Sequence, residues 1–215
     1  MSRRAVIFDL DGTLVDTLED LTAAMNAALG HFSLPGHSAQ ACKMMIGSGA
    51  RRFAARALPA DQQDLAEKLL ALAREHYRAN CFKYSRLYDG MGETVRQLRQ
   101  KGLRLAVLTN KDQVVAGRII EHFFGTGEFE SVIGAAKGRL IKPDPGTTAG
   151  IVESMGLTSE DFLFVGDSAV DIETALAAGI RSVGATWGFR GRGELEAAGA
   201  HIIIDSPGEI LDLVA

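Results

Sequence analysis

Two carboxylates, Asp9 and Asp11, stand directly after the short apolar run Ala5 to Phe8, and a glycine and a threonine follow them. The run predicts a buried β-strand, and ligands bind outside the carboxyl ends of strands in open parallel sheets. Two carboxylates held about 4 Å apart repel by about 4 kcal/mol at an effective dielectric of about 20, and a divalent cation removes that repulsion. The stretch therefore predicts a metal-dependent site, although Asp, Gly and Thr are also ordinary residues of a solvated turn.

Further polar residues follow other predicted strands. Thr109 and Asn110 come directly after the apolar run 103–108, Lys142 lies in the loop after the run 129–134, and Asp167 comes just after the run 162–165. Asp171 lies one helical turn beyond Asp167. Since parallel strands end at one edge of a sheet, we expect these residues to meet in one crevice.

Phosphoryl transfer to a carboxylate is the chemistry that needs this set. Asp9 is the predicted nucleophile, because an aspartate that accepts a phosphoryl group divides one difficult displacement into two easier ones. Asp11 is predicted to give a proton to the leaving alcohol and then to take one from water. Mg²⁺ prefers hard oxygen ligands, and we expect it to be held by Asp9, by the backbone carbonyl of Asp11 and by Asp167.

The moving phosphoryl group itself carries negative charge that the site must stabilise. Thr109, the Asn110 backbone N–H and the Lys142 ammonium are predicted to hold its oxygens. Asp171 is predicted to lie one layer further out, where it orients a metal-bound water or Lys142.

The elements that must position these residues alternate between strand and helix in most of the chain. Strands are predicted at 5–8, 103–108, 129–134, 162–165, 181–185 and 202–204. Helices are predicted at 94–101, 114–124, 172–178 and 207–214, and one more helix contains Gly146 and Gly150. Such alternation predicts a doubly wound parallel sheet with helices on both faces. Residues 16–84 contain only helical patterns, near 17–32, 38–46, 50–58 and 61–82, so they predict an all-helical insertion between residues 1–15 and 85–215.

Composition limits the possible partners. The chain has 215 residues, 47% hydrophobic and 23% charged, with a net charge of −4 and a pI near 5.7. This acidic balance argues against nucleic-acid binding, and no apolar run is long enough for a signal peptide or a membrane span. Cys42 and Cys81 form no C-x-x-C pair. We therefore expect a cytoplasmic protein, a monomer or a homodimer, that acts on a small molecule.

Four motifs, in order and spacing, resemble those of the haloacid dehalogenase superfamily of phosphatases. They are Asp9-Leu10-Asp11-Gly12-Thr13, Thr109-Asn110, Lys142-Pro143 and Gly166-Asp167-Ser168 with Asp171. The resemblance implies a Rossmann-like core, Asp9 as nucleophile, Mg²⁺ as cofactor and a helical cap at residues 16–84 that sets substrate specificity. Members that dehalogenate lack an aspartate at the position of Asp11, so its presence implies a phosphatase or a phosphomutase.

Within the superfamily, the chain resembles the bacterial phosphoglycolate phosphatases. The stretches concerned are Asp16-Thr17, Ile46 to Ala50, Thr109-Asn110-Lys111 and Trp187-Gly188. The resemblance implies 2-phosphoglycolate as the substrate.

A loop of the predicted cap, Gly47-Ser48-Gly49, precedes a helix that begins with Ala50 and Arg51. The glycines let the backbone approach a ligand, and the helix start favours an anion, so the loop and Arg51 are predicted to bind a carboxylate of the substrate. The other interpretation is a simple tight turn with Arg51 in solvent. Trp187 is expected either to line the crevice or to pack beside the sheet.

Two other functions compete with this one. A phosphatase or mutase of another small ester, such as a sugar or amino-sugar phosphate, needs the same core motifs. A phosphorylation-controlled receiver module also clusters aspartates, a threonine and a lysine on a parallel sheet, but such modules carry no helical insertion of this size.

Overall fold

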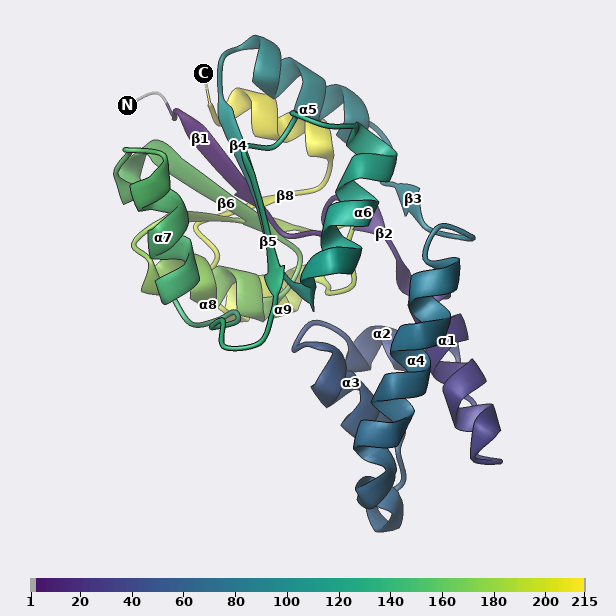
Figure 1. The fold of residues 1–215 in the computed structure, drawn as a ribbon. Helices are drawn as coiled ribbons and strands as arrows, with labels where there is room; N and C mark the ends of the chain where they lie inside the picture. Colours follow the sequence, from purple (N-terminus) through teal and green to yellow (C-terminus); the bar gives the residue numbers. More distant parts are fainter. Residues whose placement is uncertain (1–2, 215) are drawn as a thin grey trace. The chain divides into compact units, whose positions relative to one another are not determined.

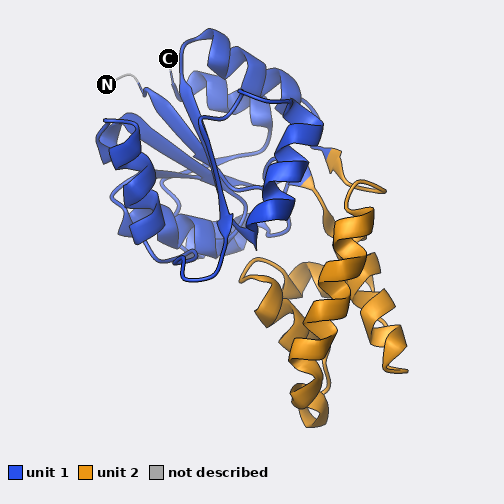
Figure 2. Cartoon of the chain, viewed as in Figure 1, with its two compact units in different colours: residues 1–15, 87–215 blue, residues 16–86 orange. Residues whose placement is uncertain are grey.

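The computed structural model describes residues 3–214, which form two compact units (Figure 2). One unit, the core, comprises residues 1–15 and 87–215; the other, the helical unit, comprises residues 16–86. The chain passes between them within β2 (Val15–Asp16) and again within β3 (Arg86–Leu87), two short strands that pair and that the sequence did not predict. These crossings lie within two residues of the boundaries expected from the sequence.

The core is built on a six-stranded sheet in the order β5-β4-β1-β6-β7-β8 (Figure 1). Every neighbouring pair in it is parallel, which confirms the predicted fold class of a Rossmann-like α/β core. The strands are β1 (Ala5–Phe8), β4 (Arg104–Asp112), β5 (Ser131–Ala135), β6 (Phe162–Gly166), β7 (Arg181–Ala185) and β8 (Ile202–Ile204).

Helices cover both faces of this sheet. In Figure 1, α5 and α6 lie on one face, and α7 and α8 lie on the other. The helices of the core are α5 (Met91–Gln100), α6 (Gln113–Phe124), α7 (Gly146–Ser154), α8 (Ala169–Ala177) and α9 (Arg192–Ala197), with short 3-10 helices at Ser159–Asp161 and Pro207–Asp212. The 3-10 helix at 207–212 replaces the longer helix predicted at 207–214, and α9 was not predicted.

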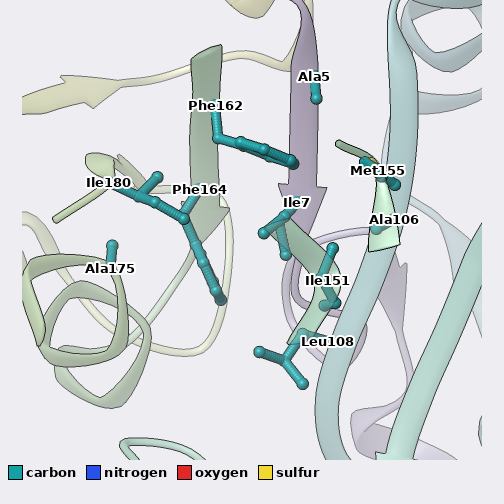
Figure 3. Close-up of a cluster of buried hydrophobic side chains, with 10 residues drawn as sticks. All are labelled: Ala5, Ile7, Ala106, Leu108, Ile151, Met155, Phe162, Phe164, Ala175 and Ile180. Carbon is teal, nitrogen blue, oxygen red and sulfur yellow. The ribbon is translucent and has the colours of Figure 1, made fainter. Parts of the chain in front are cut away.

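The apolar core explains why the sheet forms where it does. β1 is fully buried on both sides, as a central strand of a doubly covered sheet must be. On one face Ile7, Leu108 and Phe164 pack against Ile151 of α7 and against α8 (Figure 3). Buried aliphatic and aromatic side chains each contribute about 1.5 to 3 kcal/mol relative to exposure, so these rows of side chains hold the strand ends in a fixed place.

The helical unit contains α1 (Leu18–His31), α2 (Ala39–Met45), α3 (Ala50–Ala57) and α4 (Ala66–Asn80). The stretch expected as one helix at 61–82 is a 3-10 helix, Ala60–Leu65, followed by α4, because the backbone at Gln62 is not helical. Asp20 of α1 accepts hydrogen bonds from the backbone N–H groups of Tyr84 and Ser85, which ties the end of the unit to its first helix. Among residues 3–214, no helix has the length and apolar character needed to cross a membrane.

Candidate active site

The first motif begins where β1 ends. The Asp9 N–H donates to the Val165 carbonyl of β6 at 2.9 Å, which continues the sheet pairing one residue past the strand. The Asp9 carboxylate is almost fully buried. Asp11 lies further out, and its side chain keeps 15% of its surface exposed.

Lys142 joins two of the predicted carboxylates. Its Nζ lies 2.7 Å from Asp9 Oδ1 and 2.6 Å from Asp171 Oδ1, and its side chain is 3% exposed. The loop that carries it is fixed by Asn110, whose side-chain amide donates to the Lys142 carbonyl (3.0 Å) and accepts from the Lys142 N–H (2.8 Å). The Asn110 side chain therefore positions the lysine, a role that the sequence did not indicate.

Asp171 is held by the first turn of α8. The Ser168 N–H and hydroxyl donate to Asp171 Oδ2 at 3.1 and 2.7 Å, a capping box that starts the helix. Its other oxygen faces Lys142, in keeping with the predicted role of orienting that lysine.

Asp167 lies just past β6 and is enclosed by backbone. The Phe189 N–H donates to its Oδ2 at 2.6 Å, and the Thr13 hydroxyl lies 3.4 Å from its Oδ1. A Cβ at Gly12 would lie 2.4 Å from Asp167 Oδ2, and one at Gly188 would lie 2.3 Å from Asp167 Cβ, so neither position has room for a side chain. The indole of Trp187 donates to the Thr13 carbonyl at 3.0 Å, so it braces the loop that follows β1.

Thr109 and Asn110 lie inside β4, whereas the sequence placed them just after a strand ending at 108. The pairing of β4 with β5 is irregular between Leu108 and Asp112, and this irregularity carries the strand on through the polar residues. The Thr109 hydroxyl accepts from the Lys111 N–H at 3.3 Å. Both predicted residues are buried beside the end of β1.

The electrostatics of the site follow from burying several carboxylates around one ammonium. Burial raises the pKa of Asp9 to about 7; Asp171 and Asp11 add to the rise, and Lys142 opposes it. Burial, with Asp171 and Asp9, also holds the pKa of Asp167 well above its usual range. Burial alone would lower the pKa of Lys142, but Asp171 and Asp9 raise it above its ordinary value, so the lysine stays charged.

This arrangement fits a divalent cation. One carboxylate oxygen from each of Asp9, Asp167 and Asp171 lies within 4.8 Å of the others, and all three residues are buried. The donors are hard oxygens, and a cation held among them would offset the cost of burying these carboxylates, the main cause of the raised pKa values of Asp9 and Asp167. The Asp11 side chain is not part of this trio.

Lys111 is the main residue that sequence reasoning missed. Its Nζ lies 2.8 and 3.0 Å from the two oxygens of Asp11. A lysine next to two polar residues at the end of a predicted strand is expected to lie in solvent, but the Lys111 side chain is only 5% exposed. The available signal was its place directly after Thr109-Asn110.

The four predicted ligand residues of the helical unit lie in one tight turn and the start of α3. Gly47 and Gly49, which flank Ser48, have φ values of 109° and 89°, a left-handed backbone conformation in which residues with a side chain are strained. Gly49 caps α3, and Arg51 in the first turn pairs with Glu67 (Nε to Oε1, 3.3 Å). The Arg51 side chain is 78% exposed, so this ion pair is weak and easily exchanged.

Comparison with known proteins identifies the class. The model of the haloacid dehalogenase-like hydrolase family matches residues 6–185. The phosphoglycolate phosphatase of Pseudomonas putida is 35% identical over 208 residues, covering 94% of this chain and 76% of that protein. The phosphoglycolate phosphatase of Mesorhizobium japonicum is 36% identical over 196 residues, covering 89% and 86%.

A solved structure agrees with the sequence matches. The crystal structure of a predicted phosphoglycolate phosphatase from Haemophilus somnus superposes with a TM-score of 0.92 at 31% identity and covers 100% of this chain and 99% of that one. The chain therefore belongs to the haloacid dehalogenase-like hydrolase family. This confirms the predicted superfamily and enzyme class.

Proposed function

We propose that the enzyme hydrolyses phosphate monoesters with Mg²⁺ through a phosphorylated Asp9, and that 2-phosphoglycolate is its substrate. The observation that carries the chemistry is the buried trio Asp9, Asp167 and Asp171 with Lys142 between two of its members. The names of the relatives from P. putida and M. japonicum support the substrate.

In the first half-reaction, a carboxylate oxygen of Asp9 attacks phosphorus, and the bond from phosphorus to the ester oxygen breaks. The leaving oxygen takes a proton from Asp11. In the second half, Asp11 takes a proton from water as that water attacks the phosphoryl group, which leaves free Asp9 and inorganic phosphate.

The remaining core residues hold charge and orientation. Lys142, Thr109 and the Asn110 backbone N–H bind the phosphoryl oxygens, where negative charge must be stabilised during transfer. Asp171 orients Lys142 through the 2.6 Å contact between Asp171 Oδ1 and Lys142 Nζ.

Asp9, the Asp11 carbonyl and Asp167 would hold Mg²⁺, with Asp171 next to them as a partner of Lys142. When bound, the cation would supply positive charge to the site and would offset the repulsion between the carboxylates. The attacking form of Asp9 is the ionised carboxylate, and burial in this site raises its pKa to about 7, so a bound cation would favour the reactive form.

Residues 16–84 are the proposed cap, and its Gly47-Ser48-Gly49 turn with Arg51 is the proposed contact for the substrate carboxylate. Gly47 and Gly49 both have positive φ, a backbone conformation that favours glycine, and the N-terminus of α3 directly follows this turn. Backbone N–H groups at a helix start favour an anion.

Turnover of a panel of phosphate monoesters with Mg²⁺ tests the proposal. The panel contains 2-phosphoglycolate, hexose phosphates, amino-sugar phosphates, nucleotides and pyrophosphate. We expect 2-phosphoglycolate to have the highest kcat/KM and Asp9→Asn to abolish turnover, while Asp212→Asn, at an exposed aspartate of the same unit, leaves it unchanged. A higher kcat/KM for a sugar phosphate than for 2-phosphoglycolate would make the sugar phosphate the proposed substrate instead. Turnover by Asp9→Asn within about tenfold of wild type would overturn the covalent mechanism.

A further inference from the structure

The core contains two buried lysines at the site, and they contact different carboxylates. Lys142 lies between Asp9 and Asp171, whereas Lys111 contacts Asp11. The proposed mechanism uses Lys142 and assigns nothing to Lys111.

The contact of Lys111 with Asp11 is bidentate. Nζ lies 2.8 Å from Oδ1 and 3.0 Å from Oδ2, so the ammonium engages both oxygens of one carboxylate. An isolated ion pair on a surface leaves its side chains free to move, but here the lysine is 5% exposed and the aspartate 15%. The pair therefore fixes both the direction and the plane of the Asp11 carboxylate.

The backbone on both sides of this pair is also held. The Lys111 N–H donates to the Thr109 hydroxyl at 3.3 Å, and β4 continues past Lys111 to Asp112. On the other side, Asp11 bridges to Val15, and the Gly12 N–H donates to the Val15 carbonyl at 3.0 Å. The ion pair thus joins the ends of two neighbouring strands, β1 and β4, through groups with little freedom.

Proton transfer makes a strict demand on Asp11. Its oxygen must lie within about 2.6 to 3.2 Å of the leaving oxygen while Asp9 attacks phosphorus from the other side. Asp11 is more exposed than Asp9 and is not held by the carboxylate trio, so its own neighbours must supply that orientation.

We propose that Lys111 is a positioning residue for Asp11: through its two contacts it holds the proton-transferring carboxylate toward the leaving group of the substrate. This inference rests on the proposed phosphatase function. It concerns geometry alone, and Lys111 itself exchanges no proton and forms no bond to phosphorus.

The test compares Lys111→Met with wild type on three substrates in Mg²⁺. Methionine keeps an unbranched apolar stem and removes the ammonium. Ethyl phosphate and 2-phosphoglycolate have poor leaving groups that need a proton, whereas p-nitrophenyl phosphate leaves without one. We expect kcat/KM for both alkyl esters to fall about 10- to 100-fold, and kcat/KM for the aryl ester to change by less than about threefold. The ratio kcat/KM covers only the steps up to release of the alcohol or phenol, so it excludes the later attack of water, in which Asp11 acts on every substrate.

Two further variants sharpen the result. In an Asp11→Asn background, Lys111→Met should cause no additional loss on the alkyl esters, because residues that act as a unit are not additive. Lys101→Met, at an exposed lysine after α5, is the matched control and should leave all three rates unchanged. The p-nitrophenyl phosphate rate reports a folded site, and Lys111→Gln replaces Lys111→Met if the latter does not fold.

Three outcomes would overturn the inference. Equal losses on all three substrates would make Lys111 a general structural residue, and no loss on any would make the ion pair dispensable. A loss confined to 2-phosphoglycolate would mean that Lys111 binds the substrate carboxylate instead. Failure of the proposed phosphatase activity is separate, since wild type would then turn over none of the three esters.

Discussion

The buried carboxylates make the metal-free enzyme sensitive to pH, and Asp9 allows the size of the effect to be worked out. Its pKa rises from 3.8 to about 7 on folding, mainly through burial. A difference of about 3 units corresponds to about 4 kcal/mol at about 1.4 kcal/mol per unit.

The sign follows from which state holds the proton. A carboxyl group whose pKa is higher in the folded state than in the unfolded state binds its proton more tightly when the protein is folded, so protonation stabilises the fold. The stabilisation by protonated Asp9 is therefore complete below the unfolded pKa of 3.8 and is lost as the pH rises from there through about 7. Of the total, about 3 kcal/mol is lost between about pH 5 and about pH 8. Asp167 acts in the same direction.

Urea unfolding in the presence of a chelator, at pH values from about 5 to about 8, measures this effect. Over that interval we expect wild type to lose about 3 kcal/mol more of its free energy of unfolding than Asp9→Asn, which has no charge to bury. Asp212→Asn is the matched control and should follow wild type. Mg²⁺ binds the ionised carboxylates, so it should stabilise wild type more at the upper end of the range than at the lower end.

Equal pH dependence of wild type and Asp9→Asn in chelator would refute this reasoning. It would mean that the Asp9 carboxyl ionises in the folded protein as readily as in the unfolded chain, and that Lys142 fully compensates its burial.

Three further predictions concern the metal, the helical unit and the substrate. Ca²⁺ should compete with Mg²⁺ and inhibit, because it accepts about 6 to 8 oxygens and can engage both oxygens of Asp9; equal activity in the two cations would contradict this. Asp20→Ala should lower the free energy of unfolding by about 2 to 4 kcal/mol, because it leaves hydrogen-bond donors of Tyr84 and Ser85 without their acceptor. A change below about 1 kcal/mol in urea unfolding would show that water takes the place of the carboxylate. Arg51→Ala should cost about 1.5 to 3 kcal/mol in kcat/KM for 2-phosphoglycolate and almost nothing for a phosphate ester whose aryl group is neutral. Glu67→Gln, which removes only the ion pair with Arg51, should change kcat/KM for neither substrate. Equal responses of both substrates to Arg51→Ala would exclude a carboxylate contact.

Most of the core could be predicted from the sequence, because its signals are local. Each strand is a short apolar run, and parallel pairing then brings Asp9, Thr109 and Asp167 to one edge without further information. The boundaries were less accurate: β4 extends to Asp112 through polar residues, since pairing with β5 rather than hydrophobicity keeps it extended there.

The parts that sequence reasoning missed depend on contacts between distant residues. Nothing in a single run of sequence tells that Lys111 lies against Asp11, 100 positions earlier, or that the Asn110 amide grips the backbone of Lys142. Likewise, the glycine at 188 is explained only by the approach of Asp167 and the Gly12 carbonyl.

The central claim is that Asp9 carries the phosphoryl group, and trapping that intermediate tests it most directly. Asp11→Asn should slow the attack of water on the intermediate, so acid quenching of this variant during turnover of p-nitrophenyl phosphate with Mg²⁺ should leave protein heavier by one phosphoryl group. Peptide mass spectrometry should then place that group on Asp9. Turnover by Asp11→Asn with no trapped phosphoryl group, or with the group on another residue, would contradict the account.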